Sequence, residues 1–535
     1  MPRPPDRRPI TPCGPPSVRC VRPHLGAAAR AAWVFLVAGS ILVGSKRAEA
    51  AGQTASPREI PPASTTPASP GPPLAARLAA LLRGPVFHPE ETGVAILLLP
   101  QERPILLKNA DRALKPASTL KILTSAAALA LLRPEFVYET RILADAPIDA
   151  DGNLPGNLYI RGSGAPDLVG ESWWLMAHRL AAMGLRRVNG DLVGDESYFD
   201  GVRRPFGWPA PAADSWYNAP VGALSCNFNV VSVRIEPSAL LGARPDLTLE
   251  PIASYFQVLN RAVTGSGPTS LAVARSFEGG RNALVVSGTI RRGGGPVTYN
   301  RSVEDPALYA LHAFREIARG EGIEIRGALT VAVVPDTARE LYRHESRPLA
   351  SLVRDMNKNS NNFMAEALVK TLGAQFVDVP GTTANGLEVI RTYLSGAGLD
   401  AARATLADGS GLSDEDRVPA RLLAELLARV HADFELGPEM EASFPVGGVD
   451  GTLDERFGGE AAKRRVRAKT GRIAGALSLA GYAANRDGRE FAFAFLANQP
   501  RGSIEAVHRA IDRVIDELVG SQDADLAPLP DGTGR

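Results

Sequence analysis

Three observations predict an α/β (α+β) fold with a β-rich insertion. The chain has 535 residues, which is more than one hydrophobic core usually supports. Helix and strand signals occur together in two outer segments, residues 73–145 and 343–520. Residues 146–342 between them carry short strand signals separated by turns, which is typical of β-rich structure. We therefore expect a main domain, built from both outer segments, and an insertion of one or two β-rich domains.

The two ends of the main domain carry its clearest signals. Residues 74–82 have helical composition, and residues 94–99 form an apolar run of buried-strand length. Near the other end, the apolar runs 477–484 and 491–496 are joined by an Asp-Gly turn, which is a hairpin signal. A helix is then predicted after an N-cap at Ser503, with its apolar residues on one face.

The first fifty residues have the features of an export signal. Arginines precede an apolar stretch over 31–43, and Ala48-Glu-Ala50 offers the small residues that signal peptidase accepts. We expect cleavage near Ala50 and a periplasmic or extracellular protein with no transmembrane span in its mature part. An uncleaved anchor is the alternative, although the stretch is short for a bilayer span of about twenty residues. Residues 51–72 are predicted to be a disordered linker, and residues 521–535 a disordered tail.

Composition excludes several classes of function. A formal net charge of +1 leaves no basic excess to hold nucleic acid. Cleavage of the signal would remove Cys13 and Cys20, and the remaining Cys226 cannot form an internal disulfide. We expect Cys226 to be buried by packing rather than to act as a nucleophile. The histidines lack ligand spacing, so neither a metal nor a cofactor is expected.

Ser118-Thr-Leu-Lys121 pairs a nucleophile with a base. Pro116 marks a turn before the apolar helical run 122–132, which predicts Ser118 at a helix N-terminus, where free N–H groups stabilise negative charge. Lys121 lies one turn later on the same face. Burial among apolar residues would favour loss of its proton, and the neutral amine could then activate the serine. Alone, this pattern occurs by chance about once in a chain of this length.

Two further strings supply what else a serine acyl-transfer site needs. Ser360-Asn-Asn362 lies where a polar loop turns into a helix, so a plain helix cap is the alternative interpretation. We expect Ser360 to relay a proton toward the leaving group, and Asn362 to hold Lys121 and a substrate carbonyl. Lys469-Thr-Gly471 precedes the C-terminal hairpin, on a strand expected at the edge of a sheet. Glycine there permits close approach of another backbone or of a ligand.

The order and spacing of the strings carry more weight than any one of them. Each occurs in the local context that the chemistry needs: a helix start, a loop before a helix, and an edge strand. Ser118 and Ser360 are 242 positions apart, whereas Ser360 and Lys469 are 109 apart. We therefore predict that the strings meet in one cleft and that the protein forms a covalent acyl-serine intermediate.

With these motifs the chain resembles the penicillin-binding proteins and serine β-lactamases. The long first gap makes it similar to the class C low-molecular-mass penicillin-binding proteins, the D-alanyl-D-alanine carboxypeptidase/endopeptidase family. Further strings outside the expected site also resemble that family: Gly194-Asp-Glu-Ser-Tyr-Phe199, Asn218-Ala-Pro220 with Asn227 and Asn229, Asp408-Gly-Ser-Gly-Leu412 and Gly448-Val-Asp-Gly-Thr-Leu453. The resemblance implies a serine β-lactamase/transpeptidase-like main domain. It also implies a D-alanyl-D-alanine carboxypeptidase and D-alanyl-meso-diaminopimelyl endopeptidase that acts on peptidoglycan stem peptides and is acylated by β-lactam antibiotics.

The resemblance assigns a role to each motif residue. Ser118 is expected to be the nucleophile and Lys121 the general base, with Ser360 and Asn362 as partners from the second motif. Lys469 and Thr470, beside Gly471, are expected to anchor the substrate's terminal carboxylate, and the backbone N–H groups of Ser118 and Arg472 to form the oxyanion hole.

Arg472 is a departure from the family pattern. The family commonly has Ser or Thr at this position, where the hydroxyl helps to bind the carboxylate. A guanidinium group has no hydroxyl but can pair with the same anion. The backbone role of Arg472 is therefore kept, and its side chain is expected to bind substrate differently.

Two other functions are alternatives. A β-lactamase needs fast deacylation, for which class A enzymes use a Glu-x-x-x-Asn string between the second and third motifs. The only asparagine from 363 to 468 is Asn385, and Gly381 stands four residues before it, so penicillin is expected to acylate Ser118 and stay bound. A non-catalytic wall-binding protein would have lost a motif residue, and this chain has lost none.

Overall fold

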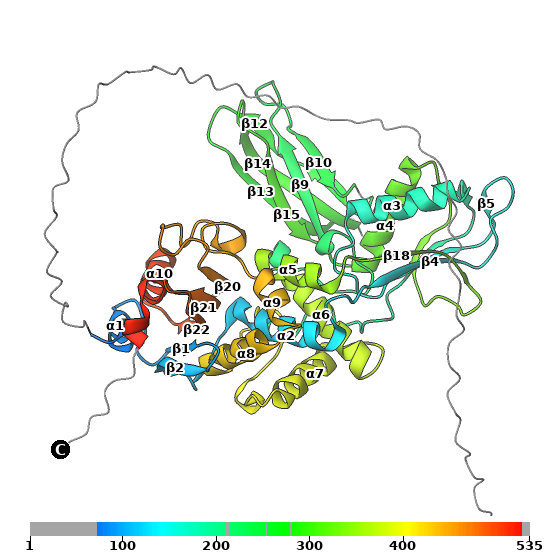
Figure 1. Ribbon diagram of the computed structural model, residues 1–535. Helices are drawn as coiled ribbons and strands as arrows, with labels where there is room; N and C mark the ends of the chain where they lie inside the picture. Colours follow the sequence, from blue (N-terminus) through cyan, green and yellow to red (C-terminus); the bar gives the residue numbers. More distant parts are fainter. Residues whose placement is uncertain (1–71, 209–213, 253, 279–280, 527–535) are drawn as a thin grey trace, which may run out of the picture. The chain divides into compact units, whose positions relative to one another are not determined.

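The computed structural model describes residues 72–208, 214–252, 254–278 and 281–526 (Figure 1). The predicted export signal and all but the last residue of the predicted linker lie outside these ranges. The predicted tail begins too early, because Asp523–Leu526 form a 3-10 turn whose Leu526 is buried. An ion pair of 2.8 Å between Arg77 and Asp525 fastens this turn to the first helix.

A five-stranded antiparallel sheet forms the centre of the main domain. Its order is β2-β1-β22-β21-β20, so the first two strands of the chain pair with its last three. The strands are β1 (Thr92–Leu98), β2 (Arg103–Lys108), β20 (Val466–Ile473), β21 (Ala476–Ala484) and β22 (Glu490–Asn498). The predicted hairpin is confirmed as β21 and β22, and the strand with the third motif, β20, is an edge strand as expected.

Helices cover both faces of this sheet. They are α1 (Leu74–Leu81), α2 (Lys121–Leu132), α5 (Leu349–Asn359), α6 (Asn362–Phe376), α7 (Thr383–Gly396), α8 (Ala420–Ala432), α9 (Gly437–Ser443) and α10 (Ile504–Gly520). A short pair, β3 (Ala113–Leu114) and β19 (Val418–Pro419), lies beside them. Among the helices of the described residues, none combines the length and apolar character needed to cross a bilayer.

Phenylalanine and alanine alternate along β22, and the two residue types belong to hydrophobic cores on opposite faces of the sheet. Phe491, Phe493 and Phe495 belong to the core shared with α1 and α10, the two helices that lie next to each other in Figure 1. Ala492 and Ala494 point to the other face and join the core formed with α2 and α5 to α8. Successive side chains of a strand point to opposite faces, so large rings on one side and alanines on the other fit two different layers of helices. The Ser503 hydroxyl accepts the Ala506 N–H and caps α10, as predicted.

The insertion contains several small sheets. One has the order β17-β8-β6-β4-β18, a second β16-β7-β5, a third β10-β9-β15, and a fourth joins β11, β12 and β13 to β14. These strands are β4 (Glu139–Ala144), β5 (Asn153–Leu154), β6 (Leu158–Arg161), β7 (Arg187–Val188), β8 (Leu192–Asp195), β9 (Val230–Glu236), β10 (Asp246–Glu250), β11 (Gln257–Asn260), β12 (Val263–Gly265), β13 (Ser270–Glu278), β14 (Arg281–Arg291), β15 (Val297–Ser302), β16 (Glu324–Ile325), β17 (Leu329–Val331) and β18 (Arg339–Glu345).

Strand pairing carries the insertion beyond its predicted limits of 146 and 342. The strand β4 lies before the lower limit and β18 runs past the upper one, yet β4 pairs with β6 and β18 pairs with β4 in one sheet. The insertion also contains two helices, α3 (Gly170–Ala182) and α4 (Pro306–Gly320), that pack on each other through Trp173 and Phe314. It is therefore β-rich with a helical layer, and the two strands that enter and leave it lie side by side.

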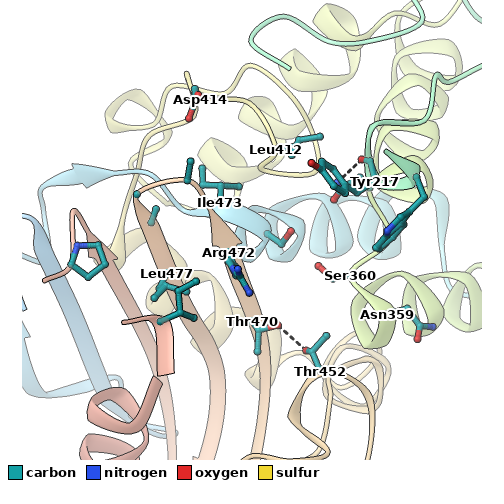
Figure 2. A pocket seen from close by; sticks show the side chains of 18 residues that line it. Tyr217, Asn359, Ser360, Leu412, Asp414, Thr452, Thr470, Arg472, Ile473 and Leu477 are labelled. Carbon is teal, nitrogen blue, oxygen red and sulfur yellow. Dashed lines mark hydrogen bonds between the residues drawn. The ribbon is translucent and has the colours of Figure 1, made fainter. Parts of the chain in front are cut away.

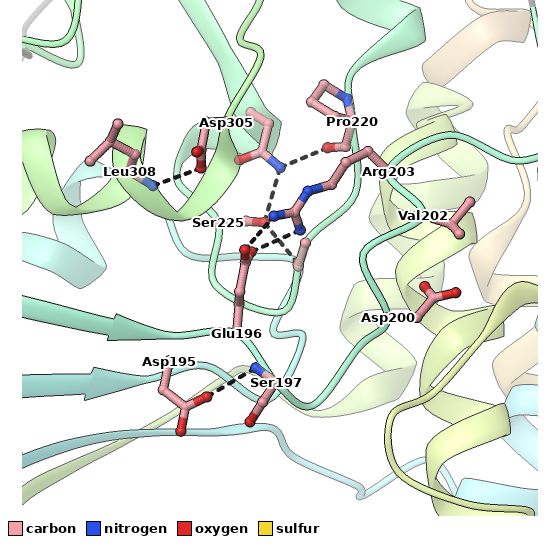
Figure 3. Close-up of polar contacts among 12 residues, drawn as sticks. Asp195, Glu196, Ser197, Asp200, Val202, Arg203, Pro220, Ser225, Asp305 and Leu308 are labelled. Carbon is pink, nitrogen blue, oxygen red and sulfur yellow. Dashed lines mark hydrogen bonds and ion pairs between the residues drawn. The ribbon is translucent and has the colours of Figure 1, made fainter. Parts of the chain in front are cut away.

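One segment of the insertion is fastened to the main domain. Figure 3 shows Arg203 bonded to Glu196, with Asp200 and Val202 of the same segment nearby. The ammonium group of Lys370, on α6, forms an ion pair with Asp200 and donates to the Val202 carbonyl oxygen at 2.6 Å. Lys370 is fully buried, so this tie joins the insertion directly to the helix that begins with the second motif.

Replacing Phe493 by alanine is expected to destabilise the main domain by about 3–5 kcal/mol, because the ring is 1% exposed and its loss leaves a cavity. The matched control is Phe434→Ala, whose ring is 94% exposed and whose loss should stay within about 0.5 kcal/mol. Thermal unfolding followed by circular dichroism compares the two. Equal melting temperatures would contradict the assignment of Phe493 to a close-packed core.

Candidate active site

Ser118 lies in a 3-10 turn, Ala117–Leu120, that leads directly into α2. The residue before it, Ala117, has a left-handed backbone with φ 47°. Gly411 packs against this turn so closely that a Cβ atom at position 411 would lie 1.9 Å from the Ala117 carbonyl oxygen. The backbone just before Ser118 is thus held in an unfavourable conformation by its neighbours, as is common where a reactive side chain must be presented.

Lys121 is fully buried next to Ser118. Its ammonium group donates to the Ser118 hydroxyl oxygen at 2.9 Å, to the Asn362 amide oxygen at 2.7 Å and to the Ser410 carbonyl oxygen at 2.7 Å. These three acceptors match the three N–H donors of a lysine. Burial nevertheless lowers the pKa of Lys121 to about 8, because an ammonium group loses its hydration there.

Three buried carboxyl groups lie near this lysine. They belong to Glu366 on α6 and to Asp408 and Asp416 in the loop before α8, and each favours the charged form of Lys121. Burial, with a contribution from Asp408, raises the pKa of Glu366 to about 8 and the pKa of Asp416 to about 10. These two carboxyl groups are therefore mainly protonated at pH 7, which limits how far they oppose the loss of the lysine proton.

The second motif lies between α5 and α6. Ser360 ends α5 in a left-handed conformation with φ 55°, and the Asn361 side chain caps α6 by accepting the Met364 N–H. The amide oxygen of Asn362 accepts from Lys121, as expected, while its nitrogen donates to the Tyr217 carbonyl oxygen at 2.9 Å. One Asn362 N–H is therefore occupied by the insertion, a contact that the sequence did not indicate.

The third motif brings a second buried lysine to the site. Lys469, on β20, donates to the Ser360 hydroxyl oxygen at 2.8 Å and to the Thr470 carbonyl oxygen at 2.7 Å. Burial, reinforced by the charge of Lys121, holds the pKa of Lys469 well below its usual value. The second and third motifs are therefore joined by a direct hydrogen bond between their side chains.

Gly471 explains how closely β20 approaches Ser118. A Cβ atom at this position would lie 2.1 Å from the Ser478 hydroxyl oxygen and 2.9 Å from both the Pro116 carbonyl oxygen and the Ser118 nitrogen. No side chain larger than hydrogen fits there without a shift of the backbone. The absence of a side chain thus places the strand backbone beside the Ser118 N–H, as the expected oxyanion hole requires.

These residues open into a cleft of about 820 Å³. Figure 2 shows Ser360, Thr452, Thr470 and Arg472 around it, with Tyr217 of the insertion on the opposite wall. The cleft is lined by Ser118, Trp216, Tyr217, Asn359, Ser360, Asn362, Leu412, Asp414, Thr452, Thr470, Arg472, Ile473, Ala474, Gly475, Ala476, Leu477, Pro500 and Ile504. Five of the eight predicted site residues are among these, and the other three, Lys121, Lys469 and Gly471, do not line the cleft.

Two strings that were expected outside the site belong to it. Asp408–Leu412 supplies the Ser410 carbonyl oxygen that holds Lys121, and Gly448–Leu453 supplies Thr452, whose hydroxyl is 2.7 Å from that of Thr470. Their glycines and small polar residues are turn signals in the sequence, and only the fold shows what the turns contact.

Sequence analysis also did not identify a row of polar side chains along one face of α6. Asn362, Glu366 and Lys370 are spaced four residues apart, so they lie on one helix face. They reach Lys121, the Gly409 N–H and Asp200 respectively. This spacing was visible in the sequence, but such a row usually indicates a solvated face.

Other expectations concern groups away from the cleft. Cys226 is buried and unpaired, and burial raises the pKa of its thiol, as expected for a packing residue. The described ranges contain no group of three or more His, Cys, Asp or Glu side chains arranged to hold a metal ion.

Comparison with known proteins identifies relatives over most of the chain. The model of the D-Ala-D-Ala carboxypeptidase 3 (S13) family matches residues 74–520. A D-alanyl-D-alanine carboxypeptidase of Actinomadura sp. (strain R39) is 32% identical over 458 residues, which cover 83% of this chain and 84% of that relative. The D-alanyl-D-alanine carboxypeptidase DacB of Haemophilus influenzae is 29% identical over 404 residues, 74% of this chain and 83% of the relative.

Solved structures agree with this relationship. The crystal structure of penicillin binding protein 4 (dacB) from Haemophilus influenzae matches with a TM-score of 0.72 and 25% identity, covering 83% of this chain and 99% of that one. The same protein complexed with a β-lactam matches with a TM-score of 0.67. These findings confirm the predicted fold class and the predicted family resemblance. The chain belongs to the D-Ala-D-Ala carboxypeptidase 3 (S13) family and is a serine-type D-Ala-D-Ala carboxypeptidase.

Proposed function

We propose that Ser118 is the nucleophile and Lys121 its general base. The observation that carries this assignment is the 2.9 Å contact between the Lys121 nitrogen and the Ser118 hydroxyl oxygen in a fully buried setting. With a pKa of about 8, roughly a tenth of Lys121 is neutral at pH 7, enough to accept the serine proton. The Ser118 oxygen then bonds to the carbonyl carbon of the penultimate D-alanine.

The leaving group needs a proton when the peptide bond breaks. Ser360 lines the same cleft and accepts a hydrogen bond from Lys469, and we assign it the transfer of a proton to the departing amine. D-Alanine leaves, and water then attacks the acyl ester and regenerates Ser118. The N–H groups of Ser118 and Arg472 hold the oxygen that becomes negative in both steps.

Peptidoglycan stem peptides are the proposed substrates, and β-lactams the proposed acylating inhibitors. The family and the β-lactam complex of the Haemophilus influenzae relative support both. A cleft of about 820 Å³ has room for more than a terminal dipeptide, which supports endopeptidase action on D-alanyl-meso-diaminopimelyl cross-links as well. The export features of residues 1–50 support a periplasmic or extracellular location, where these substrates occur.

The Arg472 guanidinium group is proposed to bind the substrate's terminal carboxylate. It lines the cleft next to Thr470 and makes no hydrogen bond or ion pair with any residue of the described ranges. A free guanidinium group offers paired donors that match a carboxylate, so it replaces the hydroxyl that the family commonly has here.

Ser118→Ala is expected to abolish D-alanine release and the covalent penicillin adduct, since no other nucleophile is proposed. Intact-protein mass spectrometry after penicillin treatment should show one stable adduct on the unaltered protein and none on the variant. Ser125→Ala changes a buried serine on α2, the helix that follows the turn of Ser118, and as the control it should keep the adduct. An adduct on the Ser118 variant would contradict the assignment.

Gly471→Ala is expected to lower the rate of penicillin acylation at least a hundredfold, because the new methyl group would push β20 away from the Ser118 N–H. Gly459→Ala is the control, since a Cβ atom there meets nothing within 4 Å. Stopped-flow kinetics with a fluorescent penicillin measures both variants. Wild-type kinetics for Gly471→Ala would rule out the close approach as a requirement.

Arg472→Ala is expected to raise KM about tenfold for peptides that end in a free carboxylate. The reason is the loss of one charge-assisted contact, which contributes about 1.4 kcal/mol of binding free energy. Peptides with an amidated C-terminus should react equally with both proteins. Arg467→Ala removes an arginine from the same strand outside the cleft and serves as the control. If the amidated peptide lost as much as the free acid, Arg472 would have no carboxylate-binding role.

A further inference from the structure

A buried loop of the main domain is organised around one carboxylate. Asp408 is 0% exposed and accepts hydrogen bonds from its own loop and from the insertion. Within the loop the donors are the N–H groups of Ser410, Gly411, Leu412 and Ser413, at 2.6 to 3.0 Å, and the Ser410 hydroxyl at 3.0 Å. From the insertion, the Trp208 indole N–H donates to it at 2.7 Å.

This loop contacts the catalytic lysine directly. The Ser410 carbonyl oxygen accepts from Lys121 at 2.7 Å, and the neighbouring Gly409 carbonyl oxygen accepts from the Thr124 hydroxyl at 2.7 Å. Gly411 abuts the Ala117 carbonyl oxygen, one residue before the nucleophile. A shift of this loop would therefore move an acceptor of Lys121 and a support of the Ser118 turn together.

Trp208 reaches the loop on a segment that is itself packed against it. The Asp414 N–H donates to the Gly207 carbonyl oxygen at 3.3 Å. A Cβ atom on Gly207 would lie 2.3 Å from the Ser413 hydroxyl oxygen, so the Gly207 backbone packs directly against the Ser413 side chain. The contacts of Gly207 thus hold the neighbouring Trp208 where its indole N–H reaches Asp408, and Trp208 is not among the residues that line the cleft.

We propose that Trp208 is a positioning residue for Lys121: its N–H group holds the Asp408 carboxylate, and Asp408 holds the loop whose Ser410 carbonyl orients the lysine. This inference rests on the proposed role of Lys121 as general base. It gives the insertion a part in catalysis, through a contact between positions 200 residues apart. Small misplacements of a catalytic group have large effects on rate, so one lost donor should be measurable.

The pH at which Lys121 loses its proton depends on the charged and titratable groups around it. They are Asp408 and Asp416 from the loop, Glu366 from α6, and Lys469 from β20. Removing the Trp208 N–H leaves all of these titratable groups in place. Its loss should therefore lower the acylation rate without moving the pH at which Lys121 loses its proton.

The test compares Trp208→Phe with Trp174→Phe in the full chain. Trp174 also donates its indole N–H to a carboxylate, Glu321 at 2.8 Å, but lies within the insertion and away from the site. The measurement is the rate of acylation by a fluorescent penicillin from pH 5 to 10. We expect a plateau about tenfold lower for Trp208→Phe, with the midpoint of its acid limb unchanged, and a wild-type profile for Trp174→Phe. A wild-type plateau for Trp208→Phe would overturn the proposal.

A second substitution separates the hydrogen bond from packing. Replacing Trp208 by 3-benzothienylalanine keeps the bicyclic shape and removes only the N–H donor, so it decides the question if Trp208→Phe fails to fold. The same tenfold fall is expected, and a wild-type rate would contradict the inference.

A double-mutant cycle tests whether Trp208 acts through Asp408. Trp208→Phe should cause no further loss in an Asp408→Asn background, whereas fully additive losses would show that Trp208 acts elsewhere. Lys121→Ala identifies failure of the underlying assignment. If that variant is acylated at the wild-type rate, the proposed general base is wrong; if it is inactive while Trp208→Phe is unimpaired, only the positioning role is wrong.

Discussion

Burial of the Lys121 ammonium group is the constraint on which the site depends. A charged amine removed from water is costly unless its donors are satisfied, and here each of the three donors has an acceptor. Those acceptors come from the 3-10 turn before α2, the start of α6 and the loop before α8. The cost of burial is what brings the pKa of Lys121 toward neutrality, and the acceptors prevent that cost from destabilising the fold.

The surrounding architecture follows from the need to bring these segments together. β20 must lie against the turn of Ser118, which only a glycine at position 471 permits. Ala117 and Ser360 adopt left-handed backbone conformations that residues with side chains rarely take. Such conformations persist where the surrounding packing determines them, so the two cores that hold the sheet and its helices also hold the active site in place.

The sequence predicted the parts of this site that are local. Ser118 and Lys121 share a helical turn, and the hairpin after Lys469 has a clear turn signal, so short-range rules placed them correctly. Partners far apart in the chain could not be found this way. The contacts of Asn362 with Tyr217 and of Trp208 with Asp408 depend on how the insertion packs, which no local pattern encodes. The limits of the insertion were missed for the same reason, because strand pairing between β4 and β18 sets them.

The proposed role of Lys121 as a buried base with a lowered pKa is tested most directly by titration of its side chain. Protein labelled with ¹³C and ¹⁵N in its lysine side chains can be titrated by NMR, with the Lys121 signal assigned from its absence in Lys121→Arg. The proposed role predicts a midpoint near pH 8 for this residue. A midpoint at or above the ordinary value of 10.5 would contradict it, because the lysine would then be too weak a source of free amine at neutral pH.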